Sequence, residues 1–129
     1  MPSILVVTTV HHPGDARIRY RQIETLLRKG WRVTYAAPFR GYGLATREQV
    51  APGLSVINLP RAVGRRRLAG LRSAHQLLKH RAGEFDLVLL HDPELLISYI
   101  GAGATNVVLD VHEDPAAAIE AKEWIPRLA

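Results

Sequence analysis

Residues 4–10 read Ile-Leu-Val-Val-Thr-Thr-Val, and residues 11–15 continue with His-His-Pro-Gly-Asp. Such a run of aliphatic and β-branched side chains is typical of a strand that is buried on both faces of a parallel sheet. Apolar side chains then recur at helical spacing, at Ala16, Tyr20, Ile23 and Leu27. Asp15 is placed to cap this helix and Gly30 to end it. A buried strand that leads directly into a helix indicates an α/β fold.

The alternation of strands and helices continues along the chain. Further strands are predicted at residues 32–37, 54–59, 86–90 and 106–111. Further helices are predicted at residues 66–81, 92–101 and 114–124, the first with Leu68, Leu71, Leu77 and Leu78 facing inward. Residues 39–53 contain three glycines and a proline and are predicted to form a long loop. We therefore predict a single α/β, Rossmann-like domain, with a doubly wound parallel sheet of about five strands and helices on both faces.

Composition excludes several classes of protein. The chain has 129 residues, of which 47% are hydrophobic and 22% charged, as is typical of one globular domain. It has no cysteine, which excludes disulfides and thiolate nucleophiles. No apolar stretch approaches the roughly 20 residues of a membrane-spanning helix. No basic stretch precedes the first apolar run, so we expect a cytoplasmic protein.

The net charge of +5 is unevenly distributed. Residues 1–83 carry 15 basic and 3 acidic residues, whereas residues 84–129 carry 2 basic and 9 acidic residues. The basic residues that lie in an acid-free stretch are Arg61, Arg65, Arg66, Arg67, Arg72, Lys79 and Arg81. Such a stretch indicates either an anionic partner or a solvated helix face. It contains no aromatic residue for base stacking and no known binding motif, so nucleic acid is not expected as the partner.

Polar side chains gather at three predicted strand ends, which in a parallel α/β sheet lie on the ligand-binding edge. The residues concerned are His11, His12, Gly14, Asp15, Arg17, His91, Asp92, Asp110, His112, Glu113 and Asp114. Four of the six histidines are among them. An alternative is that the aspartates only cap the helices that follow and that the histidines are polar loop residues.

Common catalytic motifs are missing. The loop at residues 10–15 is not G-x-G-x-x-G, and the chain has neither a P-loop nor a G-x-S-x-G elbow. Asp110-Val111-His112 is similar to the Asp-x-His of dinuclear phosphoesterases, but the further histidine motifs of those enzymes do not follow. A metal-dependent hydrolase is therefore disfavoured, and we predict no bound metal.

Three segments resemble one known family. Residues 12–18 contain His12-Pro13 and Asp15-x-Arg17-Ile18, followed by Leu27-x-x-Gly30-x-x-Val33. Residues 91–96 read His-Asp-Pro-Glu-Leu-Leu. Residues 110–114 read Asp-Val-His-Glu-Asp, followed by Lys122-x-Trp124-Ile125-Pro126. In this order, and each at a predicted strand end, they resemble the N-terminal part of the family-4 type retaining glycosyltransferases. The resemblance covers most of the chain and is weakest over residues 39–81.

The resemblance implies the GT-B arrangement, in which an N-terminal acceptor domain faces a C-terminal domain that holds the nucleotide-sugar donor. It implies that sugar is transferred with retention, without a metal and with no cofactor besides the donor co-substrate. His112 would contact the donor sugar as the catalytic residue. The loop residues His11, His12, Gly14 and Asp15 would approach the donor diphosphate and the acceptor, Arg17 would stabilise that loop, and His91, Asp92 and Glu113 would bind substrate.

Two departures from the family are visible. The first loop has a single glycine, Gly14, where many members have two, and the spaced glutamate pair of the donor domain is not within residues 1–129. We therefore expect residues 1–129 to be the N-terminal domain, inactive without a donor-binding domain in cis or in trans. The alternative is an accessory or regulatory domain that binds a full-length transferase.

The acid-free basic stretch gains a possible role from this resemblance. Its arginines at positions 61, 65, 66, 67 and 72 could dock on an anionic membrane that carries a lipid-linked acceptor. The protein would then lie peripherally at the inner face of the membrane. A solvated helix face is the simpler alternative.

Overall fold

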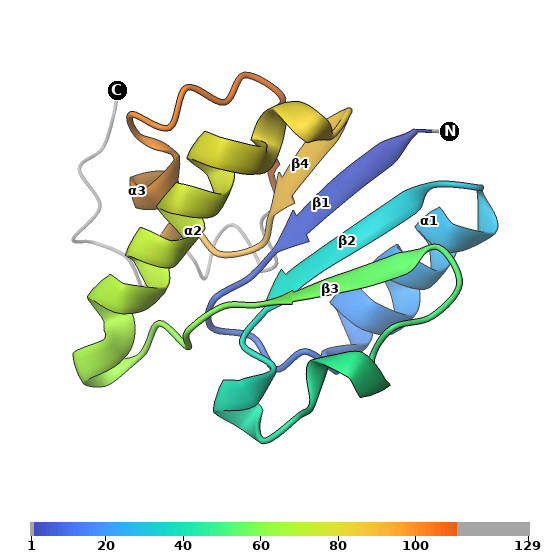
Figure 1. Cartoon of the computed structure of the whole chain (residues 1–129), viewed down its shortest axis with the longest axis horizontal. Helices are drawn as coiled ribbons and strands as arrows, with labels where there is room; N and C mark the ends of the chain where they lie inside the picture. Colours follow the sequence, from blue (N-terminus) through green and yellow to red (C-terminus); the bar gives the residue numbers. More distant parts are fainter. Residues whose placement is uncertain (1, 111–129) are drawn as a thin grey trace, which may run out of the picture.

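All five strands of the sheet run parallel in a computed structural model, which describes residues 2–110 (Figure 1). They are β1 (Ser3–Val7), β2 (Arg32–Ala37), β3 (Leu54–Asn58), β4 (Leu87–Leu90) and β5 (Val107–Leu109). Their order in the sheet is β3-β2-β1-β4-β5. The chain therefore builds outward from β1 first in one direction and then in the other, which confirms the predicted doubly wound α/β fold.

Helices cover both faces of the sheet (Figure 1). Side chains alternate along β1, so Leu5 and Val7 pack on one face and Ile4 and Val6 on the other. The first face is covered by α2 (Arg67–Arg81) and α3 (Leu95–Tyr99). The second face is covered by the π-helical segment η1 (Ala16–Ile23), which continues into α1 (Glu24–Arg28). The burial of all four side chains on β1 explains its unbroken apolar sequence.

Strand β1 ends at Val7, three residues before the predicted end. The amide of Thr8 still donates to the carbonyl of Ala36 on β2, at 3.0 Å, but Thr9 has left the ladder. The hydroxyl groups of Thr8 and Thr9 instead bind a carboxylate at the end of β4. The prediction of a strand through Val10 was wrong because polar groups distant in sequence compete for this segment.

The first helix begins with π-helical geometry, which the sequence did not predict. Ile18 and Ile23 are five residues apart and both fully buried, as the longer turn of a π-helix allows. Tyr20 belongs to the apolar residues at helical spacing, but its side chain is 64% exposed. The predicted ends of the helix are confirmed: the Asp15 carboxylate caps the first turn, and Gly30 has a φ of 86° after the last.

The other helices differ from prediction mainly at their ends. Leu71, Leu77 and Leu78 of α2 are buried as predicted, but Leu68 is 73% exposed because the first turn of α2 projects beyond the sheet (Figure 1). Helix α3 has five residues instead of the predicted ten. The short 3₁₀ segments are η2 (Arg40–Tyr42), η3 (Thr46–Glu48), η4 (Gly64–Arg66) and η5 (Ala82–Glu84). The predicted helix at residues 114–124 lies outside the described residues.

No helix within residues 2–110 is both long and apolar enough to cross a lipid bilayer. The longest of them, α2, has 15 residues and carries several charged side chains. A spanning helix needs about 20 consecutive apolar residues.

Candidate functional site

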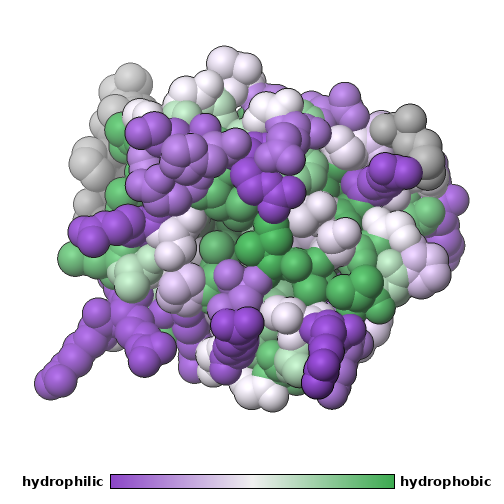
Figure 2. All heavy atoms as spheres, viewed as in Figure 1, coloured by the Kyte–Doolittle hydropathy of each residue, from purple (hydrophilic) through white to green (hydrophobic). Residues whose placement is uncertain are grey.

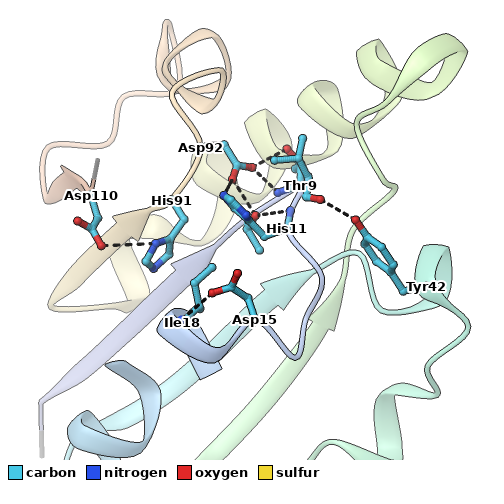
Figure 3. A network of polar contacts seen from close by, with 10 residues as sticks. Thr9, His11, Asp15, Ile18, Tyr42, His91, Asp92 and Asp110 are labelled. Atoms are coloured by element: carbon cyan, nitrogen blue, oxygen red, sulfur yellow. Dashed lines mark hydrogen bonds and ion pairs between the residues drawn. The ribbon is translucent and has the colours of Figure 1, made fainter. Parts of the chain in front are cut away.

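The Asp92 carboxylate joins the end of β4 to the loop that follows β1 (Figure 3). One oxygen accepts a hydrogen bond from the Thr8 hydroxyl at 2.8 Å. The other accepts from the Thr9 amide at 2.6 Å and from the Thr9 hydroxyl at 3.1 Å. The His11 ring nitrogen Nε2 lies 3.3 Å from the first oxygen. Because Asp92 is only 1% exposed, these contacts are shielded from water and hold the start of the loop firmly.

The interpretation of Asp92 as a helix cap was wrong for its side chain. Only its backbone carbonyl serves the turn before α3, where it accepts from the Leu95 amide at 2.9 Å. The carboxylate points away from that helix, toward the loop after β1 (Figure 3). The buried Asp92 carboxylate therefore accepts hydrogen bonds from the loop after β1 instead of capping the helix that follows it.

The loop from His12 to Asp15 is held by its own side chains. The His12 ring nitrogen Nδ1 accepts from the Gly14 amide at 2.9 Å, and the Asp15 amide donates to the His12 carbonyl at 2.9 Å. A β-carbon at Gly14 would lie 3.2 Å from the His12 ring, so glycine leaves the room that this ring needs. In the neutral ring, an accepting Nδ1 places the proton on Nε2, and the exposed His12 then presents a hydrogen-bond donor.

A second cluster joins the ends of β4 and β5 to η1. Figure 3 shows the contact between His91 and Asp110 in this cluster. The Asp110 carboxylate accepts from the Gln22 side-chain amide at 2.6 Å and lies 3.6 Å from Nδ1 of the buried His91. The Arg17 guanidinium lies 3.8 Å from its other oxygen. Arg17 and Gln22 are five residues apart, so π-helical geometry turns both toward Asp110. Arg17 therefore pairs with a carboxylate across the site instead of standing alone on the helix surface.

A third group connects the loop with the segments that follow β2 and β3. The Tyr42 hydroxyl donates to the Val10 carbonyl at 2.8 Å, and the Tyr42 ring centroid lies 4.7 Å from that of His12. The Arg61 guanidinium lies over the Tyr42 ring at 4.3 Å, within the range of a cation–π contact. The carboxyl ends of all five strands thus contribute to one connected edge.

Eight predicted residues lie along this edge, and they are His11, His12, Gly14, Asp15, Arg17, His91, Asp92 and Asp110. His112, Glu113 and Asp114 lie outside the described residues. Sequence reasoning missed Gln22, Tyr42 and Arg61 as members of the edge. Among residues 2–110, no group of three metal-ligating side chains is placed to hold a metal ion.

Tyr35 supports the loop from below. Its hydroxyl donates to the Pro13 carbonyl at 3.0 Å, and the residue is 1% exposed. Burial raises the pKa of the Tyr35 phenol well above its ordinary value, and the negative charge of Asp15 raises this pKa further. The phenol therefore stays protonated and keeps donating to the loop at neutral pH.

Replacement of Tyr35 with phenylalanine should change how the free energy of unfolding depends on pH. Because the raised pKa belongs to the folded state, Tyr35 stabilises the protein fully below its ordinary pKa of 10.0, and this contribution is lost as pH rises above it. Near neutral pH, Tyr35→Phe should lower the free energy of unfolding by about 1 kcal/mol, measured by urea denaturation. At about pH 11 the difference from wild type should shrink. The exposed Tyr20 provides the control, since Tyr20→Phe should leave the alkaline loss of stability unchanged.

No protein-family model matches the sequence, and no curated protein matches it significantly. The likeness to glycosyltransferases consequently rests on the three motif segments at the strand ends. Two of these segments lie within residues 2–110, around His12 and around Asp92, and Asp92 contacts Thr8, Thr9 and His11, which immediately precede the segment at His12. The third begins at Asp110, which contacts both of the others through Arg17 and His91.

Proposed function

We propose that residues 1–129 form the N-terminal, acceptor-side domain of a retaining glycosyltransferase with two facing Rossmann-like domains. The enzyme moves a sugar from a nucleotide-sugar donor to a hydroxyl group of the acceptor. The observation that carries the proposal is the contact of Asp92 with Thr8, Thr9 and His11. The segment that contains Asp92 meets there the residues that immediately precede the segment at His12, about 80 residues away, on the edge where parallel α/β sheets bind ligands.

The groups on this edge suit binding and orientation of an acceptor. His12 presents a donor on Nε2 to a hydroxyl or phosphate oxygen, while the buried Asp92 and Tyr35 keep the loop that carries it in place. Front-face retaining transfer, in which the leaving phosphate takes the acceptor proton, does not require the two carboxylates about 5 Å apart of a retaining glycosidase. Positioning and stabilisation of the developing charge are then the tasks of the protein. By the same resemblance, His112 would contact the donor sugar and Glu113 would bind substrate.

The basic stretch supports a membrane location, but with fewer of its residues than the sequence indicates. Arg67 pairs with Glu94 at 2.8 Å, and Arg61 lies over the Tyr42 ring. Both arginines therefore already have a partner within the protein and are less available to a membrane. The exposed basic residues around the protruding Leu68 are Arg65, Arg66 and Arg72. An exposed leucine among arginines suits shallow insertion into an anionic bilayer, where each basic residue contributes about 1 kcal/mol.

A transfer assay tests the proposal. The 129-residue chain is incubated with nucleotide sugars and candidate acceptors, alone and after addition of a separately expressed donor domain. We expect no transfer by the chain alone, because the donor-binding wall of the site is in the second domain, and transfer after mixing. Efficient transfer by the chain alone would contradict the proposal that these residues form only the acceptor side of the active site. If the chain raises the rate of an already active full-length transferase instead, it is the accessory domain of the alternative hypothesis.

A further inference from the structure

A pocket of about 430 Å³ lies at the carboxyl ends of β2 and β3, beside the third group of the site. Its wall is formed by η2 on one side and by the segment from Asn58 to Arg66 on the other. Three arginines line it, Arg40, Arg61 and Arg66, and no acidic residue does. The volume is within the range of pockets that bind small molecules.

No carboxylate within the described part of the chain neutralises the positive charge of this pocket. Among residues 2–110, Arg40, Arg61 and Arg66 form no ion pair with a carboxylate, whereas Arg17, Arg19, Arg67 and Arg81 do. The Arg61 Nε atom is buried and has no hydrogen-bond partner among the described protein groups. A buried donor of this kind costs free energy unless an acceptor binds it, so the pocket favours an anion.

Two of the donors, Arg61 and Asn58, are held in place before any ligand binds. The Arg61 guanidinium lies over the Tyr42 ring, and a β-carbon at Gly41 would lie only 3.0 Å from the Arg61 β-carbon, so glycine permits this close packing. The Asn58 side-chain oxygen accepts from the Arg40 amide at 2.8 Å, which leaves the NH₂ group of Asn58 as a further donor at the pocket. Preorganised donors of this kind favour tight and specific binding.

The start of α2 adds to the positive potential. Arg66 occupies its N-cap without a side-chain cap, and the first turn contains no acidic residue. Basic side chains at this end oppose the helix dipole, whereas an anion bound there would complement it. Figure 2 shows hydrophilic side chains projecting at the lower left of the molecule, where α2 begins in Figure 1.

We propose that this pocket binds the phosphate group of a small phosphorylated acceptor. Arginine forks match the oxygens of phosphate in bidentate fashion, and three of them suit a dianion better than a carboxylate. Contact runs from Arg61 through the Tyr42 ring to His12, so a phosphate anchored here places the rest of the molecule on the candidate site. The identification of the ligand as an acceptor rests on the proposed function, whereas the phosphate site itself does not.

Titration of the 129-residue chain with inorganic phosphate and with glycerol phosphate, followed by amide NMR shifts, tests the site. We expect saturable shifts at Gly41, Asn58 and Arg61, and a loss of affinity of about tenfold or more in Arg40→Gln and Arg61→Gln. Arg61→Lys keeps the charge but not the fork and should also lose affinity. Arg72→Gln is the matched control, because Arg72 belongs to the same basic stretch but does not line the pocket. Thermal unfolding of each variant verifies that it folds.

Equal weakening by Arg72→Gln and Arg61→Gln, or shifts spread over all basic residues, would overturn the proposal in favour of unspecific charge attraction. Vesicles of phosphatidylglycerol, with phosphatidylcholine as reference, separate the sources of phosphate. Vesicle binding that depends on Arg40 and Arg61 assigns the pocket to a lipid headgroup and overturns a small acceptor. If vesicle binding depends only on Arg65 and Arg72, the membrane binds outside the pocket, and the pocket binds small phosphates as proposed.

The two proposals can fail separately. If the chain binds phosphate specifically but transfers no sugar after addition of a donor domain, the proposed glycosyltransferase function is contradicted. The proposed phosphate site then still stands. Transfer to a phosphorylated acceptor with an unchanged rate in Arg61→Gln would overturn the phosphate anchor and leave the transferase intact.

Discussion

Replacement of Asp92 with alanine should lower the free energy of unfolding by about 3 kcal/mol, measured by urea denaturation. The carboxylate is buried and accepts hydrogen bonds from the Thr8 hydroxyl and from the amide and hydroxyl of Thr9. Alanine leaves these donors in a space too enclosed for water to replace the carboxylate freely. The lost acceptors, and not a lost helix cap, are the physical cause of the expected destabilisation.

Asp86 is a matched control for this substitution. It lies just before β4, at the opposite end of the same strand, and also accepts hydrogen bonds from β1, at 2.7 Å from the Ser3 amide and 3.3 Å from its hydroxyl. Because Asp86 is exposed, Asp86→Ala should cost less than about 1 kcal/mol. Equal losses in the two variants would contradict the central role of Asp92. Faster hydrogen exchange of the Thr9 amide in Asp92→Ala alone would locate the damage in the loop.

Most of the fold could be predicted because its signals are local. Strand β2 has its predicted bounds, and β3 and β4 lie within one residue of theirs. The cap at Asp15 and the positive φ at Gly30 follow from residue types at helix ends. Side chains that satisfy neighbouring backbone groups leave a pattern in a short window of sequence.

The errors arose where distant parts of the chain meet. Thr8 and Thr9 have high strand propensity, but Asp92, more than 80 residues away, draws them out of β1. Tyr20 fits a helical period of 3.6 residues, whereas the π-helical geometry of η1 buries Ile18 and Ile23 instead. Neither effect can be recognised from a window of neighbouring residues.

The same distinction applies to the candidate site. His11, His12, His91 and Asp92 could be predicted because strand ends of a parallel sheet share one edge. Tyr42 and Arg61 could not, because Tyr42 ends the short 3₁₀ segment η2 and Arg61 lies in an irregular segment, and the path of both depends on tertiary contacts. For Gln22, the five-residue spacing to Arg17 was a signal only for a π-helix, which is rare.

Replacement of Gly70 with alanine should also destabilise the protein, by about 2 kcal/mol, although alanine normally stabilises a helix interior by about 1 kcal/mol relative to glycine. Helix α2 passes so close to the segment after β3 that a β-carbon at Gly70 would lie 2.7 Å from the Ala62 β-carbon. It would also lie 2.8 Å from the Pro60 carbonyl oxygen and 2.9 Å from the Ala62 α-carbon. Backbone atoms must therefore move, and the clash outweighs the gain in helix propensity.

Gly83 is the control for the expected loss of stability on replacing glycine with alanine. No heavy atom lies within 4 Å of a β-carbon at Gly83, and its φ is not positive, so Gly83→Ala should change the free energy of unfolding little. Gly70→Ala should also weaken phosphate binding, because the displaced segment carries Arg61 between Pro60 and Ala62. A variant that unfolds at higher urea than wild type would contradict the close approach of α2. A destabilised variant with unchanged phosphate affinity would show that the position of Arg61 does not depend on this packing.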